Sequence, residues 1–306
     1  MTKVEVVGLG VSTVDLIALV DHYPRNDEVQ IAADMVAQGG GPVSTAVVTL
    51  ARLGARVAML DVVGDDWRGE LIKREFRNEG VDVSHLISVP GATSSTSYIM
   101  VHKGTGNRSI VNHRGTTPAL AVADLPKPLI ESARYLHVNG AHWESCLQAV
   151  SWAKDAGVRV SFDGGGHRYR PELRELVPLT AVCIVARQFA EAYTSQSYLH
   201  EAGSALLRCG PQVVGITDGV RGSWVWTRDG VSFHQPAFTV SPVVDTTGCG
   251  DTYHGAFIYG LLREWDLRQV AGAASAVAAL TSRHLGGRTG IPTFAELKGF
   301  MASVQA

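Results

Sequence analysis

Hydrophobic residues in this chain fall into short runs that alternate with longer amphipathic stretches. Short β-branched runs are typical of buried strands, and they occur at residues 4–7, 57–63, 135–138, 158–162, 182–185 and 213–216. Apolar positions three or four apart predict helices at residues 44–53, 67–78, 147–156 and 270–280. The last of these helices is expected to end at a glycine C-cap formed by Gly286 and Gly287. This alternation predicts an α/β fold in which helices cover both faces of a mostly parallel sheet.

Two further pairs of apolar runs break the alternation and are typical of hairpin strands. Residues 14–20 are expected to pair with 29–36, and residues 97–102 with 108–113 across a turn-rich connection. Together they predict a small antiparallel sheet, formed by about residues 14–37 and 96–113, that stands off one edge of the body as a lid. No repeat or linker interrupts the sequence, so we expect a single domain over residues 1–306.

Composition narrows the partners that the chain could have. The 306 residues are 45% hydrophobic and 18% charged, with a formal net charge of −2, so a nucleic-acid partner is not expected. Four scattered cysteines without C-x-x-C spacing indicate a reducing compartment, with the cytoplasm as the expected location. The amino terminus has no apolar signal core, and the longest apolar run is too short for a bilayer, so no membrane partner is expected.

The most informative segment is Asp245–Gly255, DTTGCGDTYHG, where a strand-like stretch gives way to a helix. Gly248 and Gly250 lack Cβ atoms, so backbone N–H groups there could approach a phosphate. A helix N-terminus contributes only about 0.3–1 kcal/mol to holding one anion, up to about 2 when partly buried, so a bound polyphosphate would also need Mg²⁺. Asp251 would lie in the first helical turn beside the reacting group. The alternative is an ordinary helix after a glycine turn.

Three other glycine-rich turns lie between predicted elements. The Gly8–Thr13 turn has Thr at the third glycine position of a dinucleotide fingerprint and continues into a strand, and no P-loop motif occurs, so both nucleotide motifs are excluded. The Gln38–Thr45 turn either admits a polyol or is a flexible connection. The Thr217–Gly222 turn either approaches phosphate or only closes a hairpin. Asp15 either accepts hydrogen bonds from a pair of ligand hydroxyls or is a charged residue on an edge strand.

Taken together, these segments resemble the ribokinase family (PfkB-type) of sugar kinases over nearly the whole chain. The resemblance rests on the order and spacing of the Gly8 to Asp15 strand, Gly39–Gly54, Val63–Asp66 followed by Gly80–Asp82, Thr217–Gly222 and Val244–Asp251. Within the family, residues 107–113 are similar to ketohexokinases, whereas residues 39–42 and 286–292 are similar to bacterial sulfofructose kinase-like members. The fold that the resemblance implies is a ribokinase-like three-layer α/β/α sandwich with a small antiparallel β lid.

The resemblance also implies a set of residues for ATP-dependent phosphorylation of a sugar hydroxyl. Asp251 would be the catalytic base, and an anion hole would be formed by the amides of Gly248, Cys249 and Gly250. The nucleotide would be bound by Thr217, Gly219, Gly222 and Thr247, and the sugar by Asp15, Gly40, Gly41, Thr45 and Asn112. Asp163 would meet Mg²⁺ through water. A weak carboxylate base suffices for a loose phosphoryl-transfer transition state, and the helix N-terminus is expected to lower the pKa of Asp251.

Several positions depart from the family pattern. Cys249 replaces the usual alanine of G-A-G-D, which is expected to add sensitivity to thiol reagents. Thr45 falls where ribokinases usually offer Asn to a sugar hydroxyl, and Ala186–Phe189 falls where the metal-associated N-x-x-E motif is expected. Val29 and His142 occupy positions where sulfofructose kinase-like members carry basic side chains, which favours a neutral sugar or an anion read differently.

The leading hypothesis is therefore a cytoplasmic Mg²⁺-ATP-dependent kinase for a small sugar, with a ketose as the favoured substrate. A nucleoside or sugar-phosphate kinase of the same family stays open, as does a catalytically silent sugar- or nucleotide-binding protein. A homodimer formed through the apolar outer face of the lid is expected. The identity of the sugar, the hydroxyl that receives the phosphoryl group and any need for a monovalent cation are left open.

Overall fold

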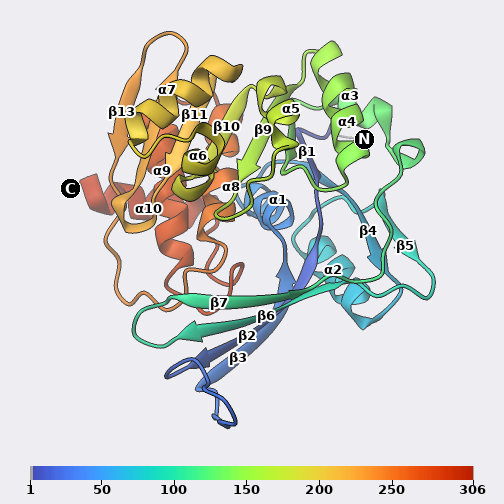
Figure 1. Cartoon of the computed structure of the whole chain (residues 1–306), viewed down its shortest axis with the longest axis vertical. Coiled ribbons are helices and arrows are strands. Elements are labelled where there is room, and N and C mark those ends of the chain that lie inside the picture. The colour runs from blue at the N-terminus through green and yellow to red at the C-terminus, as the bar shows by residue number, and fades with distance from the viewer. Residues whose placement is uncertain (1–2, 306) are drawn as a thin grey trace.

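A nine-stranded sheet forms the centre of the computed structural model, which describes residues 3–305 (Figure 1). In spatial order its strands are β13 (Ser232–Gln235), β12 (Ser223–Thr227), β11 (Val213–Thr217), β10 (Val182–Ala186), β9 (Arg159–Gly164), β8 (Tyr135–Val138), β1 (Val6–Leu9), β4 (Val57–Gly64) and β5 (Leu86–Val89). Neighbouring strands are parallel except at the β11–β12 and β12–β13 pairs. The mostly parallel sheet that the hydrophobic pattern predicts is confirmed.

Helices cover both faces of this sheet. One face carries α1 (Pro42–Arg52), α2 (Trp67–Asn78), α8 (Cys249–Leu262), α9 (Leu267–Thr281) and α10 (Phe294–Gln305), and the other carries α3 (Lys127–Ser132), α4 (Trp143–Asp155), α5 (Leu173–Leu176), α6 (Arg187–Thr194) and α7 (Leu199–Cys209). Short 3₁₀ turns lie at Val122–Asp124, Val177–Leu179 and Gly219–Arg221. Successive strand residues point to opposite faces, so Val6 enters the first core and Val7 the second. Within residues 3–305, no helix combines the length and apolar character needed to cross a bilayer.

The glycines of β1 allow α1 to pack closely against the strand. A Cβ atom at Gly8 would overlap Cγ2 of Val47, and one at Gly10 would lie 2.8 Å from Cβ of Val43. After Leu9 the chain enters another strand, β2 (Thr13–Val20), and not a helix. The Gly8–Gly10 pair is therefore explained by helix–strand packing, which agrees with the exclusion of a dinucleotide fingerprint.

A second, four-stranded sheet stands below the body in Figure 1 and forms the predicted lid. Its strand order is β3 (Asp34–Gly40), β2, β6 (Ser95–His102) and β7 (Arg108–His113). The β2–β3 and β6–β7 pairs are antiparallel as predicted, but the central β2–β6 pair is parallel. The lid is thus mixed, because its two hairpins come together through strands that run in the same direction.

The start of the second lid strand was predicted wrongly. The sequence pattern places it at residues 29–36, whereas β3 begins at Asp34 and pairs with β2 only from Leu19 onward. Val29 and Ile31 are 94% and 95% exposed in the preceding loop, because β2 ends at Val20 and offers them no partner strand. These two apolar side chains produced the strand-like pattern in the sequence, but they pack against nothing within residues 3–305.

The two faces of the lid differ in what they contact. Ile17, Ile99 and Val101 are buried on the inner face, where Leu285 from the body packs against them. On the outer face Met35, Tyr98 and Val111 are 66%, 49% and 62% exposed. The register places Tyr98 opposite Val111, so these two apolar side chains are neighbours, and Met35 lies on the same face opposite Ala18.

The predicted glycine C-cap of α9 is also wrong, although the helix ends within one residue of the predicted position. The helix ends at Thr281, and its C-cap, Ser282, keeps a right-handed conformation with φ of −64°. Gly286, with φ of 102°, comes five residues after the end of the helix. Gly286 and Gly287 instead contact the segment that leads into α8, through Asp245 and Gly248.

The close contact between β1 and α1 predicts the effect of adding one methyl group. Gly8→Ala should lower the free energy of unfolding by about 1–3 kcal/mol, because Val47 is β-branched and cannot move aside without strain. Urea denaturation followed by circular dichroism measures this change. Gly299→Ala in α10 is the matched control, since a Cβ there meets no atom within 4 Å and should raise stability by up to about 1 kcal/mol. Equal effects of the two substitutions would contradict the packing argument.

Candidate active site

The N-terminus of α8 presents the glycine turn that the sequence singles out. Gly248 is the N-cap residue and adopts a left-handed conformation with φ of 74°. In the part of the chain that the structure describes, the amides of Gly248 and Gly250 find no backbone acceptor, and that of Cys249 makes only a long 3.4 Å contact with the carbonyl of Thr246. Amides left free at a helix N-terminus can bind an anion, so residues 248–250, called here the phosphate turn, have the geometry of an anion hole.

The buried carboxylate of Asp245 fixes this turn. Its Oδ1 accepts the amide of Thr247 at 2.7 Å, and its Oδ2 accepts the amide of Gly286 at 2.8 Å. A Cβ atom on Gly248 would lie 2.7 Å from Cα of Gly287, so the two glycine segments touch backbone to backbone. Gly286 and Gly287 therefore support the phosphate turn and do not cap α9.

Asp251 is half-buried in the first turn of α8. No hydrogen-bond donor within residues 3–305 reaches its carboxylate. Burial, followed by the charge of Asp163, raises its pKa to about 6, although Arg168, His254 and Arg108 act in the opposite direction. The expectation that the helix N-terminus would lower this pKa is thus corrected, because desolvation and a like charge outweigh the helix dipole.

Asp163, the second-last residue of β9, lies against a histidine from α8. Its Oδ1 lies 3.2 Å from Nε2 of His254, which follows Asp251 by three residues and so shares its helix face. Burial by itself would raise the pKa of Asp163, but the His254 ring, with Arg168, holds that pKa well below its usual range. The neighbouring His137, 5.6 Å from the His254 ring, is neutral because burial lowers its pKa to about 3.

Several buried polar atoms at this site lack a protein partner. Within the described chain they include Oδ2 of Asp163, Nδ1 of His254, Oγ1 of Thr247, Oγ of Ser12 and Nε2 of Gln38. Buried polar groups are normally hydrogen-bonded, so their concentration here indicates a site that binds water or a polar ligand.

The donor set fits Mg²⁺ held mainly by a ligand. No three His, Cys, Asp or Glu side chains among residues 3–305 gather into a metal cage. Mg²⁺ keeps several waters and commonly takes one or two carboxylates together with phosphate oxygens, and the unpartnered Oδ2 of Asp163 offers such a carboxylate oxygen.

The Thr217–Gly222 turn lies beside α8. Ser223, directly after the turn, shares a 2.8 Å hydrogen bond with the hydroxyl of Tyr253. Asp218 receives two hydrogen bonds from Arg221 and one from Arg187, and these contacts lower its pKa. Arg187, in the segment where the family motif N-x-x-E is expected, therefore braces this turn. Gly219 and Gly222 have φ of 55° and 87°, so the turn requires glycine.

The predicted sugar residues gather where β2 and β3 meet α1. Asp15 is buried in β2, accepts the Thr13 hydroxyl at 2.7 Å, and has a raised pKa, mainly because of desolvation. A Cβ atom at Gly40 would overlap its carboxylate, and Gly41 is the N-cap of α1 with φ of 96°. Thr45 is also here, but its hydroxyl accepts a hydrogen bond from Nε of Arg288 at 3.2 Å.

A polar row crosses all four lid strands on the inner face. The register aligns Gln38 with Asp15, Asp15 with Ser97, and Ser97 with Asn112. The amide of Asn112 donates to the Ser97 hydroxyl at 3.1 Å. The sequence analysis found Asp15 and Asn112 but missed Gln38 and Ser97, which strand alternation from Asp15 could have revealed.

The lid also contacts Thr246, two residues before the phosphate turn. The carbonyl of Gly106 accepts both the amide of Thr246 at 3.1 Å and its hydroxyl at 2.8 Å. Nη1 of Arg108 donates to the same hydroxyl at 2.9 Å. Arg108, which the sequence analysis did not single out, is thereby placed beside the turn that leads to Asp251.

Three residues that depart from the family pattern, His142, Val29 and Cys249, lie in different environments. Nδ1 of His142 accepts the amide of Leu120 at 3.0 Å, so Nε2 carries the proton and donates to Asp61 at 2.8 Å. Both ring nitrogens are therefore engaged within the fold. Val29 lies on the exposed lid loop. Burial raises the pKa of the Cys249 thiol to about 12, so the predicted sensitivity to thiol reagents is not supported by its surroundings.

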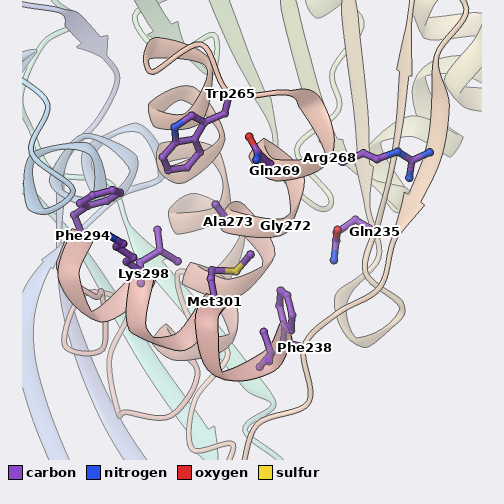
Figure 2. A pocket seen from close by; sticks show the side chains of 12 residues that line it. Gln235, Phe238, Trp265, Arg268, Gln269, Gly272, Ala273, Phe294, Lys298 and Met301 are labelled. Atoms are coloured by element: carbon purple, nitrogen blue, oxygen red, sulfur yellow. The ribbon is translucent and has the colours of Figure 1, made fainter. Parts of the chain in front are cut away.

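A separate apolar cavity of about 530 Å³ lies between α9, α10 and the segment after β13 (Figure 2). Trp265, Phe238, Phe294 and Met301 line it, with the polar side chains of Arg268 and Lys298. None of the predicted site residues contributes to its wall. We therefore assign it no part in the chemistry.

Solved structures share this fold over its full length. A putative ribokinase from Agrobacterium tumefaciens superimposes with a TM-score of 0.87 at 25% identity, covering 99% of both chains. A putative ribokinase II from E. coli, solved with ATP and Mg²⁺, gives a TM-score of 0.86 at 20% identity, covering 98% of this chain and 99% of that one. The ribokinase-like three-layer fold with its lid is confirmed.

Curated relatives cover almost the whole chain. An ATP-dependent ribose-1-phosphate kinase of Halopiger xanaduensis is 26% identical over 98% of both chains, and a 5-dehydro-2-deoxygluconokinase of Shouchella clausii is 28% identical over 97% of this chain and 95% of that one. A ribokinase of Haemophilus influenzae is 28% identical over 96% and 97%. The closer likeness to ketohexokinases or sulfofructose kinases is not confirmed by these relatives. Residues 1–294 match the model of the pfkB family of carbohydrate kinases, and the chain belongs to this family.

Proposed function

We propose that this protein transfers the γ-phosphoryl group of ATP to a hydroxyl of a small sugar, with Asp251 as the catalytic base. The observation that carries the proposal is the carboxylate of Asp251, which stands without a protein donor beside free helix-terminal amides and has a pKa raised to about 6. A base with a pKa near the working pH is suited to proton transfer. Its place next to an anion hole is what phosphoryl transfer requires.

Separate groups of residues would bind the nucleotide, bind the sugar and stabilise the transferring phosphoryl group. The amides of residues 248–250 stabilise charge on the transferring group, and Asp251 accepts the proton of the acceptor hydroxyl. The Thr217–Gly222 turn and Thr247 bind nucleotide phosphates, and the polar row around Asp15 orients the sugar. Bound Mg²⁺, held by ATP phosphates with Asp163 through water, would neutralise phosphate charge. Arg108, anchored on Thr246, adds positive charge at the same end of the site.

A neutral sugar is the favoured acceptor, with a ketose as our specific proposal. His142 is not free to bind an anionic substrate, because its two ring nitrogens are hydrogen-bonded to the amide of Leu120 and the carboxylate of Asp61. A sugar-phosphate or nucleoside acceptor is the second candidate, since relatives are named ribose-1-phosphate kinase and nucleoside kinase. The free amides and unpartnered base argue against a catalytically silent protein. All four cysteines are free thiols, which suits the cytoplasm.

We also propose a homodimer formed through the outer face of the lid. Met35, Tyr98 and Val111 are exposed apolar side chains on this face, with Tyr98 and Val111 side by side, and exposed apolar surfaces commonly mark protein contacts. A second copy of the chain would cover this surface in an isologous contact.

The reaction is tested with a panel of acceptors and coupled detection of ADP. The panel contains D-fructose, D-ribose, ribose 1-phosphate, 5-dehydro-2-deoxygluconate and adenosine. Asp251→Asn should lower kcat with the best acceptor by about 10²–10⁴, because the proton has no acceptor, while the thermal shift caused by Mg-ATP is retained. Asp155→Asn, an exposed change at the end of α4, is the control. Full turnover in Asp251→Asn would remove the proposed mechanism, and no ADP with any acceptor would favour a silent protein.

The raised pKa of Asp251 predicts a titration in the free enzyme. Its side-chain carboxyl ¹³C resonance should titrate near pH 6, and activity should rise as pH increases from 5 to 7, because only the ionised form accepts a proton. Asp163→Asn removes a neighbouring negative charge and should move the midpoint to lower pH. A midpoint near the ordinary value for aspartate, or one that rises in this variant, would contradict the analysis.

The dimer proposal predicts that a charge on the lid separates the subunits. Val111→Lys should convert a dimer to a monomer at micromolar concentration in light scattering after size exclusion, because a lysine would have to lose its hydration in the contact. Val231→Lys, at an exposed position in the β12–β13 hairpin, is the matched control. A monomeric parent protein would refute the proposal.

A further inference from the structure

Arg288 is a buried cation that the proposed reaction does not use. Its side chain is only 4% exposed. Its Nε donates to Oγ1 of Thr45 at 3.2 Å, and its Nη2 donates to the carbonyl of Gly40 at 3.1 Å and to Oγ of Ser44 at 2.6 Å. Its Nη1 donates to Oε2 of Glu75 at 3.4 Å. A guanidinium has five N–H donors, so these contacts satisfy most of them.

All the neutral acceptors of Arg288 belong to one segment, Gly39–Thr45, called here the sugar turn. Glu75 of α2, the anionic partner of Arg288, accepts the amide of Gly39 at 2.6 Å. The two members of the ion pair thus bind neighbouring backbone groups of the sugar turn. Glu75 accepts the amide of Gly39, and Arg288 donates to the carbonyl of Gly40. A Cβ atom at Gly39 would overlap Nη1 of Arg288, so the guanidinium occupies the space that a side chain at position 39 would need.

The two residues before Arg288 hold the phosphate turn. The amide of Gly286 donates to Asp245, and Gly287 lies against Gly248. The consecutive residues 286–288 therefore contact both turns: Gly286 and Gly287 support the phosphate turn, and Arg288 binds the sugar turn. Because the covalent chain fixes the distance between Gly287 and Arg288, it also fixes the spacing of the two turns.

We propose that Arg288 is a positioning residue that holds the sugar turn at the distance from the phosphate turn that phosphoryl transfer requires. In this reading Thr45 and Ser44 act as acceptors for Arg288, and Thr45 takes no sugar hydroxyl. The proposal rests on the proposed kinase function and assigns a role to residues outside its machinery. Reacting groups that are misplaced by about 1 Å can lose two orders of magnitude in rate, so loosening this link should affect transfer strongly.

The structural half of the proposal can be tested without activity, by amide hydrogen exchange of the free protein. Arg288→Met removes every donor while keeping an apolar stem, and it should speed exchange in residues 39–46 at least tenfold. Arg52→Met is the matched control: Nη1 of Arg52 holds the carbonyl of Arg288 at 2.8 Å, and Arg52 pairs with Glu79, but it does not touch the sugar turn. Exchange in residues 39–46 should change less than twofold in this control. No acceleration in Arg288→Met, or equal acceleration in both variants, would overturn the proposal.

The functional half is tested by steady-state kinetics with Mg-ATP and the best acceptor of the panel. Arg288→Met should lower kcat/KM for the acceptor by about 10- to 100-fold and leave the KM for ATP within threefold, and Arg288→Lys should recover part of the loss. A KM for ATP that rises more than tenfold would refute a positioning role. If Arg288→Met does not fold, Ser44→Ala, which removes one acceptor, should show the same selectivity at smaller size. A panel without any active acceptor would refute the proposed function, while the exchange experiment would still decide the structural half.

Discussion

The carboxylate of Asp245 holds together the two backbone segments on which the active site depends. It accepts one amide from each, at Thr247 and Gly286, and it is fully buried. Gly248 must then be glycine, because a side chain there would strike the backbone of Gly287 and its φ of 74° is left-handed. The amides of the phosphate turn stay free because they stand at the N-terminus of α8, where no preceding turn offers them carbonyls.

The electrostatics of the site depend on which groups have partners. Asp163 has His254, so it stays ionised although it is buried, whereas Asp251 has no partner and keeps its proton more easily. A helix N-terminus is worth at most about 2 kcal/mol, or about 1.5 pKa units, and burial next to a like charge exceeds this contribution. The chain thus places two carboxylates in different protonation equilibria near the N-terminus of α8, one from β9 and one from α8 itself.

Much of the fold could be predicted because its signals are local. Alternating strand and helix patterns identified the parallel sheet, hairpin-like runs that break this alternation identified the lid, and the glycine motif identified the helix that begins at the phosphate turn. The wrong predictions came from places where local pattern and tertiary contact disagree. Val29 and Ile31 have strand-like composition but no partner strand, and Gly286 looks like a helix cap but serves Asp245. Arg288 escaped notice because its acceptors lie about 240 residues away in sequence, and no spacing rule connects them.

The contact between the lid and Thr246 has a consequence for the catalytic cycle. A lid that swings outward must break both bonds to the carbonyl of Gly106 and withdraw Arg108 from the Thr246 hydroxyl. Thr246 lies two residues before the left-handed Gly248, so in the proposed mechanism such a swing would loosen the loop that binds the nucleotide. Entry of the next sugar and departure of ADP would then depend on the same hinge movement, and this movement would limit turnover wherever it is slower than phosphoryl transfer.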